Sequence, residues 1–269
     1  MTLYERHKEI LNQLQREQIV YTSQLKDQFL TSFETIRKDL QCLEEQGLLK
    51  RIHGGAVPAD EEEVLQNIAV PSLPLPENFL RRRKSRIEQK RQIAHKACEF
   101  IQEGTCIALD TGTTSYELCL LLLERFQKLT IVTNSMINAM VLSQNPNFTV
   151  IVTGGIVSQE KALVSEFVTP VLDNINIETM FLTTCGIDPR TGIAEQTVGE
   201  ISIHKKMAAR SRQLIVLADS SKFSMQASFH AYDFCETYCI ITDWLLEEEI
   251  QAEYEKIGVP ILIAQQKPQ

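Results

Sequence analysis

Short apolar runs alternate with helical segments along the C-terminal two thirds of the chain. The runs are CIALD, LTIVTN, FTVIVTGG, MFLTT, LIVLAD, YCIITD and VPILIA, and the segments between them include IAHKACEFI, SYELCLLLLERF and ISIHKKMAARS. Strands that are apolar on both faces and separated by helices are typical of a mostly parallel sheet. The pattern therefore predicts a Rossmann-like α/β domain over residues 90–269.

The first 57 residues follow a different pattern. Apolar residues recur at helical spacing over residues 4–16, and YTSQLKDQF begins a second short helix with Thr22 or Ser23 as its expected N-cap. Ser32 is the expected N-cap of a third helix, FETIRKDLQCLEEQ. That helix ends at Gly47, and LLKRIHGGAV follows as two short strands around a Gly54-Gly55 turn. Three helices and a hairpin predict a winged helix over residues 1–57.

Residues 58–89 are expected to link the two domains. They begin with an acidic stretch and continue with PSLPLP, whose prolines extend the chain. Residues 81–91, RRRKSRIEQKR, have a charge balance of +6. A solvated helix face or a linker is favoured for this basic stretch over additional contacts with DNA phosphates.

Composition indicates a cytoplasmic protein. The net charge of the 269 residues is −8, no apolar run is long enough to cross a bilayer, and the start of the chain lacks the pattern of a signal peptide. The seven cysteines are scattered through apolar segments, as expected for reduced, buried thiols. Cys235 and Cys239 lack a second Cys/His pair at zinc spacing, so we expect no metal and no cofactor.

Helical periodicity divides the third helix into two faces. The apolar arc, expected to pack against the other helices, comprises Phe33, Ile36, Leu40 and Leu43. Thr35, Lys38 and Gln41 point the opposite way, where they can enter a DNA groove. Arg37 lies on the flank, from which its guanidinium reaches a phosphate. An ordinary packing unit with a solvated charged face has the same periodicity, so periodicity alone does not decide between the two.

The stretch FETIRKDLQCLEEQGLLKRIHGGAV resembles the DNA-binding signature of the DeoR family of bacterial transcriptional regulators, a T-I-R-R-D-L helix followed by a G-L-L-x-R-x-H-G-G-A wing. The resemblance implies a double-stranded DNA operator as partner. The residues expected to contact DNA are Ser32, Thr35, Arg37, Lys38, Gln41, Lys50, Arg51 and His53. Two positions depart from the family pattern, because Leu30 replaces a glycine before the helix and Lys38 replaces the second arginine.

The winged helix has eight basic and eight acidic residues, so its charge balance is zero. Affinity for DNA depends largely on phosphate neutralisation, and a single such unit would bind weakly. We therefore expect a homodimer or a higher homo-oligomer that holds two of these units on paired half-sites.

Three small polar loops follow apolar runs in the C-terminal domain. After Asp110, the residues Gly112, Thr113 and Thr114 lie at the start of a helix, where free N–H groups and the helix dipole attract an anion. The other two loops are Thr133-Asn134-Ser135 and Thr153-Gly154-Gly155. Loops at the carboxyl ends of parallel strands converge on one crevice, which predicts one shared site. For any one loop, simple helix capping is an equal alternative.

Together with CGID at 185–188, Glu200 and DSSKF at 219–223, these loops resemble the effector domain of the DeoR family over residues 90–245. That domain is similar to ribose phosphate and glucosamine phosphate isomerases, which implies a phosphorylated sugar as effector. By this resemblance Gly112, Thr113 and Thr114 hold the phosphate, Asp110 and Asn134 face the sugar, and Lys222 supplies positive charge. The full expected effector set is Asp110, Gly112, Thr113, Thr114, Asn134, Ser135, Gly155, Gly186, Asp188, Glu200 and Lys222.

Three positions of this domain depart from the family pattern. Ser165 and Thr183 stand where the family commonly has glycine, and they narrow the expected pocket. His204 stands where the family has lysine. A histidine there makes pH-dependent binding conceivable, although a lone histidine is more often an ordinary surface or core residue.

The resemblance implies a transcriptional regulator, which we expect to be a repressor of carbohydrate metabolism genes and not an enzyme. The alternative is an isomerase-like enzyme with an attached DNA-binding domain, with Asp110, Asp188 or Glu200 as base and Lys222 as electrophile. No carboxylate pair is fixed by spacing, which disfavours catalysis. A DNA-binding structural protein without a ligand is a third possibility. The identity of the effector, the operator and the sign of regulation stay open.

Overall fold

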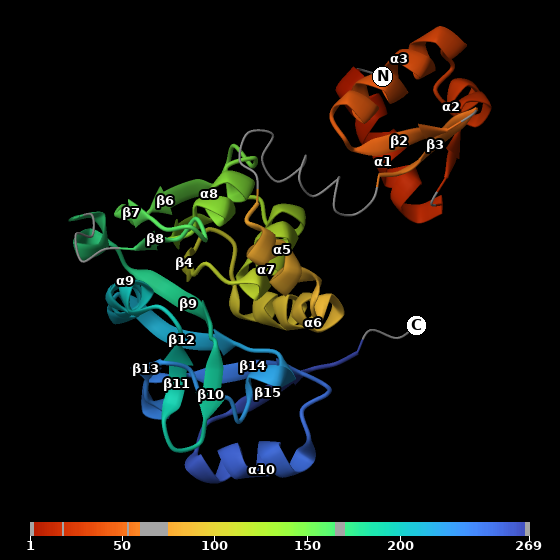
Figure 1. The fold of residues 1–269 in the computed structure, drawn as a ribbon. Helices are drawn as coiled ribbons and strands as arrows, with labels where there is room; N and C mark the ends of the chain where they lie inside the picture. Colours follow the sequence, from red (N-terminus) through yellow and green to blue (C-terminus); the bar gives the residue numbers. More distant parts are fainter. Residues whose placement is uncertain (1–2, 18, 53, 60–74, 165–169, 267–269) are drawn as a thin grey trace. The chain divides into compact units, whose positions relative to one another are not determined.

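The computed structural model describes residues 3–17, 19–52, 54–59, 75–164 and 170–266 (Figure 1). The chain divides into two compact units, residues 1–74 and residues 75–269. Among the described residues, no helix is both long and apolar enough to span a membrane.

The N-terminal unit is a winged helix, as the sequence predicts. Its helices are α1 (Leu3–Glu17), α2 (Thr22–Gln28) and α3 (Phe33–Glu45), and its strands are β1 (Val20–Tyr21), β2 (Leu49–Ile52) and β3 (Gly55–Pro58). The strands form an antiparallel sheet of order β1-β3-β2. Ile10, Leu25, Ile36 and Leu40 are among the buried side chains that hold the helices to this sheet.

Two expected turns of this unit differ in detail. Tyr21 is the N-cap of α2 and makes no side-chain cap bond, so the expectation of Thr22 or Ser23 was wrong. Gly55 lies in β3 opposite Ile52 and not in the turn. A Cβ atom on Gly55 would lie 2.0 Å from the carbonyl oxygen of Val20, so glycine is needed there for the close approach of β1.

The buried face of α3 also differs from its predicted arc. Ile36, Leu40 and Leu43 are buried as expected, but Phe33 is 47% exposed, with the ammonium of Lys26 lying 5.0 Å from its ring centre. Phe33 is the first residue of α3, where the helix has not yet reached the core.

The buried position that periodicity missed is Asp39, which is 2% exposed. Its carboxylate accepts hydrogen bonds from Arg6 at 2.5 and 2.9 Å and contacts His7 Nε2 at 3.2 Å. This bidentate ion pair fixes α3 against α1.

The C-terminal unit begins at Leu75, so the expected linker over residues 58–89 extended too far. The second half of the expected linker contains helix α5 (Glu77–Lys84) and the start of helix α6 (Ile87–Ala97). Phe79 and Arg83 of α5 are buried in this unit, which explains why the basic stretch is neither linker nor a fully solvated face.

A seven-stranded sheet of order β15-β14-β12-β9-β4-β5-β6 forms the centre of the C-terminal unit, and every neighbouring pair is parallel. The strands are β4 (Cys106–Leu109), β5 (Thr130–Thr133), β6 (Thr149–Val152), β9 (Ile177–Thr183), β12 (Ser211–Leu217), β14 (Cys239–Asp243) and β15 (Ile261–Ala264). Each overlaps one of the seven apolar runs, which confirms the predicted parallel sheet.

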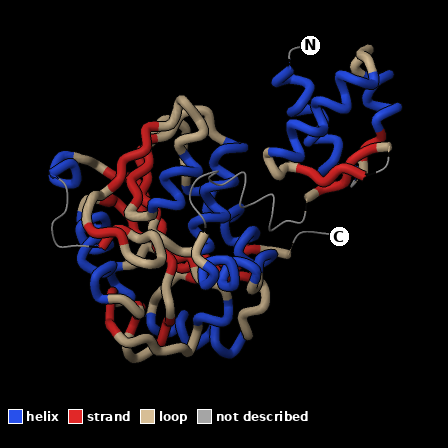
Figure 2. Tube along the Cα trace, turned by 45° about the horizontal axis from the view of Figure 1, so that its top comes forward, coloured by secondary structure: helices blue, strands red, loops and turns tan. Residues whose placement is uncertain are grey.

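Helices cover both faces of this sheet (Figure 2). Besides α5 and α6, they are α7 (Thr113–Arg125), α8 (Met136–Leu142), α9 (Val198–Ala209) and α10 (Glu248–Ile257). Ile203 and Met207 of α9 and Tyr254 of α10 pack into one core cluster with alternate residues of the strands. The intervening strand residues, such as Ile107 and Phe181, are also fully buried. Burial on both faces explains the continuous apolar character of the runs.

The direction in which strands are added to the sheet reverses between β4 and β9. The chain adds β5 and β6 on one side of β4, and it adds β12, β14 and β15 beyond β9 on the other. Loops that leave the carboxyl ends of two such strands diverge and open a crevice. Here these loops begin at Asp110, after β4, and at Thr184, after β9.

Two small antiparallel sheets were not predicted. One has the order β10-β11-β13 and comprises β10 (Gly186–Asp188), β11 (Gly192–Glu195) and β13 (Phe229–Tyr232). The other pairs β7 (Ile156–Val157) with β8 (Leu163–Val164). These strands have two to four residues each, too few for a clear alternation pattern.

Candidate functional site

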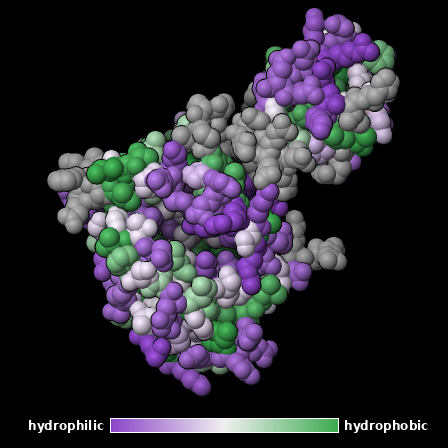
Figure 3. Space-filling view, viewed as in Figure 1, coloured by the Kyte–Doolittle hydropathy of each residue, from purple (hydrophilic) through white to green (hydrophobic). Residues whose placement is uncertain are grey.

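A cavity of about 490 Å³ opens at the reversal point, at the carboxyl ends of β4, β9 and β12. We call it the switch-point cavity. Its lining includes the loop after β4, the loop after β9 and the loop after β12, together with parts of α5, α6 and α9. Figure 3 shows hydrophilic side chains gathered on this unit around the position of α5. Most of the lining residues have charged, hydroxyl or amide side chains, so a ligand in the cavity must form hydrogen bonds.

The loop after β4 is organised by the buried carboxylate of Asp110. Its Oδ1 accepts hydrogen bonds from Gly112 N at 3.2 Å and from the hydroxyl of Ser115. Its Oδ2 accepts from Thr183 N at 2.6 Å and from Thr183 Oγ1 at 2.5 Å. Four donors occupy this carboxylate, so Asp110 holds the loop in shape, although we had expected it to face the sugar.

The same loop exposes the start of α7 to the cavity. Gly112 precedes α7 and provides no side-chain cap, so the first N–H groups of the helix are open to an anion. Thr113 and Thr114 line the cavity at this point. A Cβ atom on Gly112 would lie 1.8 Å from Thr183 Oγ1, so Thr183 leaves room only for glycine at 112.

Basic side chains from three elements line the same cavity. Lys222 follows β12 and lines the cavity, and it forms no ion pair with any residue that the structure describes. Arg82 of α5 lines it too and pairs with Glu160 at 2.9 Å. Lys90 of α6 is buried and donates from Nζ to the carbonyl oxygens of Arg82 and Ser85, which closes the end of α5. Burial lowers the pKa of Lys90 to about 8.

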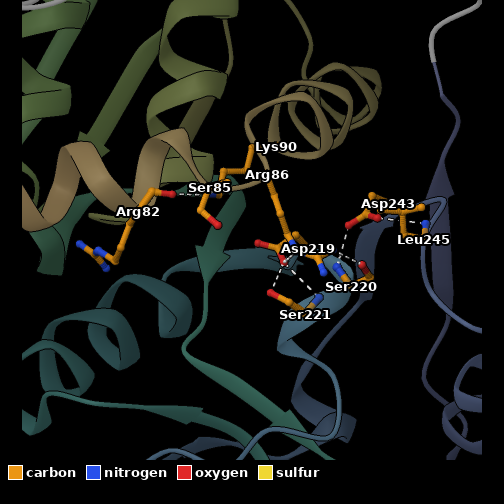
Figure 4. Close-up of polar contacts among 9 residues, drawn as sticks. All are labelled: Arg82, Ser85, Arg86, Lys90, Asp219, Ser220, Ser221, Asp243 and Leu245. Atoms are coloured by element: carbon orange, nitrogen blue, oxygen red, sulfur yellow. Dashed lines mark hydrogen bonds and ion pairs between the residues drawn. The ribbon is translucent and has the colours of Figure 1, made fainter. Parts of the chain in front are cut away.

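The loop after β12 is held by two aspartates, as Figure 4 shows. Asp219 Oδ1 accepts from Ser221 N at 3.1 Å, and Arg86 Nε lies 3.8 Å from the same oxygen. Asp243, at the end of β14, accepts from Ser220 N at 2.7 Å. Arg86 also donates to Ser220 Oγ at 2.8 Å, so the junction of α5 and α6 is bonded directly to the loop that carries Lys222.

A third part of the lining comprises Glu195, Glu200 and His204, which we call the acidic wall. Glu200 Oε2 accepts a hydrogen bond from Thr111 Oγ1 at 2.9 Å. Burial, reinforced by the charges of Asp110 and Glu200, raises the pKa of Glu195 to about 8. Burial lowers the pKa of His204 below its ordinary value, against the opposing charges of the same two carboxylates.

Helix α5 is attached to α7 behind the cavity. Arg83 Nε donates to Glu117 Oε1 at 2.6 Å, and both side chains are about 95% buried. The guanidinium of Arg83 also lies 4.9 Å from the ring centre of Tyr116, and Phe79 meets the same ring edge-on at 5.4 Å. These contacts place α5 at the rim of the cavity, where Asn78, Arg82 and Ser85 reach the lining.

The structure brings six of the expected effector residues to the switch-point cavity: Asp110, Gly112, Thr113, Thr114, Glu200 and Lys222. It does not bring Asn134 and Ser135 there. Ser135 caps α8 by accepting from Asn138 N at 3.1 Å, and Asn134 is bonded to Leu163 of β8 through both its carbonyl oxygen and its side chain. The second polar loop is closed off by the β7–β8 hairpin.

Gly155, Gly186 and Asp188 also lie outside the cavity lining. Gly155 has a φ of 124° in the turn that leads into β7. A Cβ atom on Gly186 would lie 2.3 Å from the carbonyl oxygen of Met225, so this glycine serves packing. Asp188 accepts from the backbone of Arg190 at 2.9 Å and closes the β10–β11 turn. Ser165 lies outside the described residues.

Sequence reasoning missed several residues of the lining, notably Arg82, Lys90, Thr184 and Glu195. Arg82 and Lys90 belong to the basic stretch that we had attributed to a linker or a solvated face. The cluster RRRKSRIEQKR was a visible signal, but its attachment to the α/β unit depends on the burial of Phe79 and Arg83.

In the N-terminal unit, α3 presents Arg37, Lys38 and Gln41 to solvent. Ser32 caps α3 as expected, accepting from Thr35 N at 3.1 Å. Gln41 donates to Glu45 at 2.9 Å.

On the wing, Lys50 is exposed, whereas Arg51 Nε donates to Glu44 Oε2 at 2.6 Å. The hydrogen bonds from Arg51, that of its backbone first, lower the pKa of Glu44. Arg51 would have to break its hydrogen bond to Glu44 before its guanidinium could contact DNA. His53 lies outside the described residues.

Comparison with known proteins agrees with both units. Residues 85–244 match the DeoR C terminal sensor domain, and residues 6–62 match the DeoR-like helix-turn-helix domain. The chain belongs to the DeoR family of transcriptional regulators. It is therefore a DNA-binding regulator whose C-terminal unit is a sensor domain for a small molecule, and we call the two units the DNA-reading unit and the sensor unit.

Several curated relatives align along nearly the whole chain. The HTH-type transcriptional regulator GolR of Listeria innocua is 28% identical, covering 97% of this chain and 99% of its own. The L-fucose operon activator of Haemophilus influenzae is 32% identical, covering 84% and 86%. The HTH-type transcriptional repressor CsqR of Escherichia coli is 26% identical, covering 97% and 95%. Among solved structures, a D-ribose-5-phosphate isomerase in complex with phospho-erythronic acid matches 51% of this chain and 54% of its own, at 20% identity and a TM-score of 0.39.

Proposed function

We propose that the protein is a cytoplasmic repressor of carbohydrate metabolism genes that is controlled by a phosphorylated sugar. The observation that carries the proposal is the uncapped start of α7 in a cavity that also contains Lys222. Open N–H groups, a helix dipole and a lysine without an ion pair among the described residues favour a dianionic phosphate. The surrounding hydroxyls and carboxylates suit the hydroxyl groups of a sugar.

The names of the relatives support carbohydrate control but point to both signs of regulation. One relative is an L-fucose operon activator and another is the repressor CsqR. We favour repression in which the effector prefers one arrangement of the paired DNA-reading units and so changes operator affinity.

We propose that Lys38, Thr35 and Gln41 enter the major groove and that Arg37, Lys50 and Arg51 contact phosphates. Arg37 and Lys38 are the strongest candidates, because both are exposed on α3 and, among the described residues, neither has an acidic partner such as the one that restrains Arg51. Ser32 contributes by fixing the first turn of α3. His53 stays in the proposed set from the sequence resemblance alone.

We propose that the active form is at least a homodimer and that β7 and β8 take part in the contact. Ile156 is 67% exposed and Val157 is 52% exposed, and Figure 3 shows hydrophobic side chains gathered over these strands. Exposed apolar patches of this kind mark association sites. Ile156→Asp is expected to lower the mass measured by light scattering, whereas Leu245→Asp, at a comparably exposed apolar residue, is expected to leave it unchanged.

We propose that the sensor unit binds its ligand without turning it over. Asp110 has four hydrogen-bond donors on its carboxylate, and Asp188 is bonded within a turn outside the lining, so neither is placed to abstract a proton from a ligand. Conversion of an aldose phosphate to its ketose by the full-length protein would contradict this proposal and favour the isomerase alternative.

Fluorescence anisotropy of the full-length protein on labelled DNA from upstream of its own and neighbouring genes tests the proposed function. One phosphorylated sugar is expected to release the DNA, whereas its unphosphorylated form is not. Thr113→Glu places a carboxylate where the phosphate is expected, and it should abolish release while leaving DNA affinity unchanged. Gln127→Glu adds the same charge at an exposed position outside the cavity and serves as the control. A DNA affinity that no sugar phosphate changes would contradict the effector proposal.

A further inference from the structure

We propose that the acidic wall is a subsite for the uncharged, hydroxyl-bearing end of a sugar monophosphate, and that His204 and Glu195 select against ligands with a second anionic group at that end. The inference rests on the proposed function, since it assumes that one phosphate occupies the start of α7. It adds which phosphorylated sugars the cavity accepts and which residues decide this.

The first observation is the state of His204. Its side chain is 1% exposed and lines the switch-point cavity, and neither ring nitrogen has a hydrogen-bond partner among the described residues. A core histidine with a purely structural role normally has its nitrogens satisfied, because a buried polar group without a partner is destabilising. The two nitrogens of His204 thus lack the partners that a buried imidazole normally has, and a ligand that extends to them would supply these partners.

The second observation is the state of Glu195, at the end of β11. It is 7% exposed, it lines the same cavity, and its Oε1 atom has no hydrogen-bond partner among the described residues. Burial and the charges of Asp110 and Glu200 outweigh a hydrogen bond with the Cys185 side chain and the charge of Lys222, and they raise the pKa of Glu195 to about 8, so the carboxyl group is neutral at pH 7. The pKa of His204 is lowered by burial, so the imidazole is neutral as well.

These two neutral groups fit a hydroxyl. A neutral imidazole has one N–H donor and one acceptor nitrogen, and a protonated carboxyl group likewise has one donor and acceptor capacity. A sugar hydroxyl both donates and accepts, and therefore satisfies either group. A carboxylate or second phosphate only accepts, so it could use only the one N–H of His204 and the one O–H of Glu195, and neither of these neutral groups offers it a positive charge.

The test measures binding to the full-length protein by isothermal titration calorimetry with matched ligand pairs. The pairs are erythrose 4-phosphate with 4-phosphoerythronate, ribose 5-phosphate with 5-phosphoribonate, and glucose 6-phosphate with 6-phosphogluconate, and inorganic phosphate is the probe for the start of α7. For the chain length that binds best, the aldose phosphate is expected to bind at least about tenfold more tightly than its aldonate, because the aldonate brings a second charge to the acidic wall.

Variants of His204 separate the wall from the phosphate site. His204→Leu is expected to weaken aldose phosphate binding by about tenfold while leaving the affinity for inorganic phosphate unchanged, because only the hydroxyl contact is lost. His204→Gln keeps a donor and an acceptor and should retain most of the affinity. His204→Lys adds a cation and should shift the preference toward the aldonate. Thermal unfolding and DNA affinity of each variant establish that the fold is intact.

Each outcome bears on the proposal separately from the proposed function. An aldonate that binds as tightly as its aldose, or a His204→Leu variant whose aldose affinity is unchanged, overturns the subsite while leaving the phosphate site standing. Absence of binding by inorganic phosphate and by every sugar phosphate overturns the proposed function, and the subsite with it. Aldose preference that is lost in His204→Leu and retained in His204→Gln establishes the subsite.

Discussion

Two loops of the sensor unit have nearly the same sequence character but opposite surroundings. Both follow a parallel strand with small polar residues and lead into a helix, over residues 110–112 before α7 and residues 134–135 before α8. The first helix starts without a side-chain cap and opens into the cavity. The second is capped by Ser135 and bonded to β8. Small polar residues after a strand thus permit an anion site, and the neighbouring strands decide whether one forms.

Position in the sheet explains the difference. The strand before the first loop, β4, borders the reversal point, and its other neighbour is β9. The second loop follows β5, which lies between β4 and β6, with no reversal beside it. The loops diverge only at the reversal, so only the first loop has open space above it.

The largest expected effect concerns the support behind the first loop. Arg83→Ala would leave the carboxylate of Glu117 buried on α7, where the contact with Arg91 is longer, at 3.5 Å. Removal of one partner of a buried ion pair costs about 3 to 5 kcal/mol, and we expect a loss in this range. Urea denaturation followed by circular dichroism measures it. Arg82→Ala, in a half-exposed pair, should cost less than about 1 kcal/mol. Equal effects of the two variants would contradict the assigned role of Arg83.

The second prediction concerns pH. Because the pKa of Glu195 is raised from 4.5 to about 8, its contribution to stability is present below pH 4.5 and is lost as the pH rises through 8. The free energy of unfolding of Glu195→Gln should therefore exceed that of the wild type by an amount that grows as the pH rises. At pH 9 the difference should be roughly 2 to 4 kcal/mol.

Denaturation curves at pH 5, 7 and 9 provide this comparison. Glu253→Gln makes the same substitution at an exposed position outside the cavity and serves as the control. A constant difference for Glu195→Gln would show that this carboxyl group ionises normally.

The third prediction tests whether the second loop takes part in ligand binding. Ser135→Ala removes the cap of α8 and should cost about 1 kcal/mol of unfolding free energy, since Asn138 N loses its partner. Sugar phosphate affinity should not change, because Ser135 does not line the cavity. Calorimetric titration and urea denaturation of the same sample measure both quantities. Weaker ligand binding in this variant would mean that the second loop belongs to the site after all.

The smallest expected effect lies in the DNA-reading unit. Leu30 has a φ of 49°, in the left-handed region that favours glycine, and it is 92% exposed. Leu30→Gly removes strain of about 1 to 2 kcal/mol and adds about 0.5 to 1 kcal/mol of chain entropy to the unfolded state. The free energy of unfolding is expected to rise by roughly 0.5 to 1 kcal/mol, as measured by thermal unfolding of the purified Leu30→Gly protein. Leu245→Gly, at another exposed leucine, is the control; destabilisation by Leu30→Gly would argue that Leu30 makes a contact of its own.

The sequence was sufficient for features that depend on local periodicity. The apolar runs predicted every strand of the parallel sheet, and the cap at Ser32 followed from residue type. It was insufficient where a residue's environment depends on distant segments. Asp39 is buried because Arg6 reaches it, and α5 belongs to the sensor unit because Arg83 meets Glu117. Likewise, nothing near Asn134 in the sequence indicates that β8 covers it.

The central claim is that the sensor unit binds phosphate at the start of α7 and not at the start of α8. An amide NMR titration of the deuterated full-length protein with inorganic phosphate, and then with the best sugar phosphate, tests it most directly. The account predicts large, saturable shifts for the amides of Thr113 and Thr114 and none for those of Met136 and Ile137. Shifts centred on α8, or no shift at either helix, would contradict it.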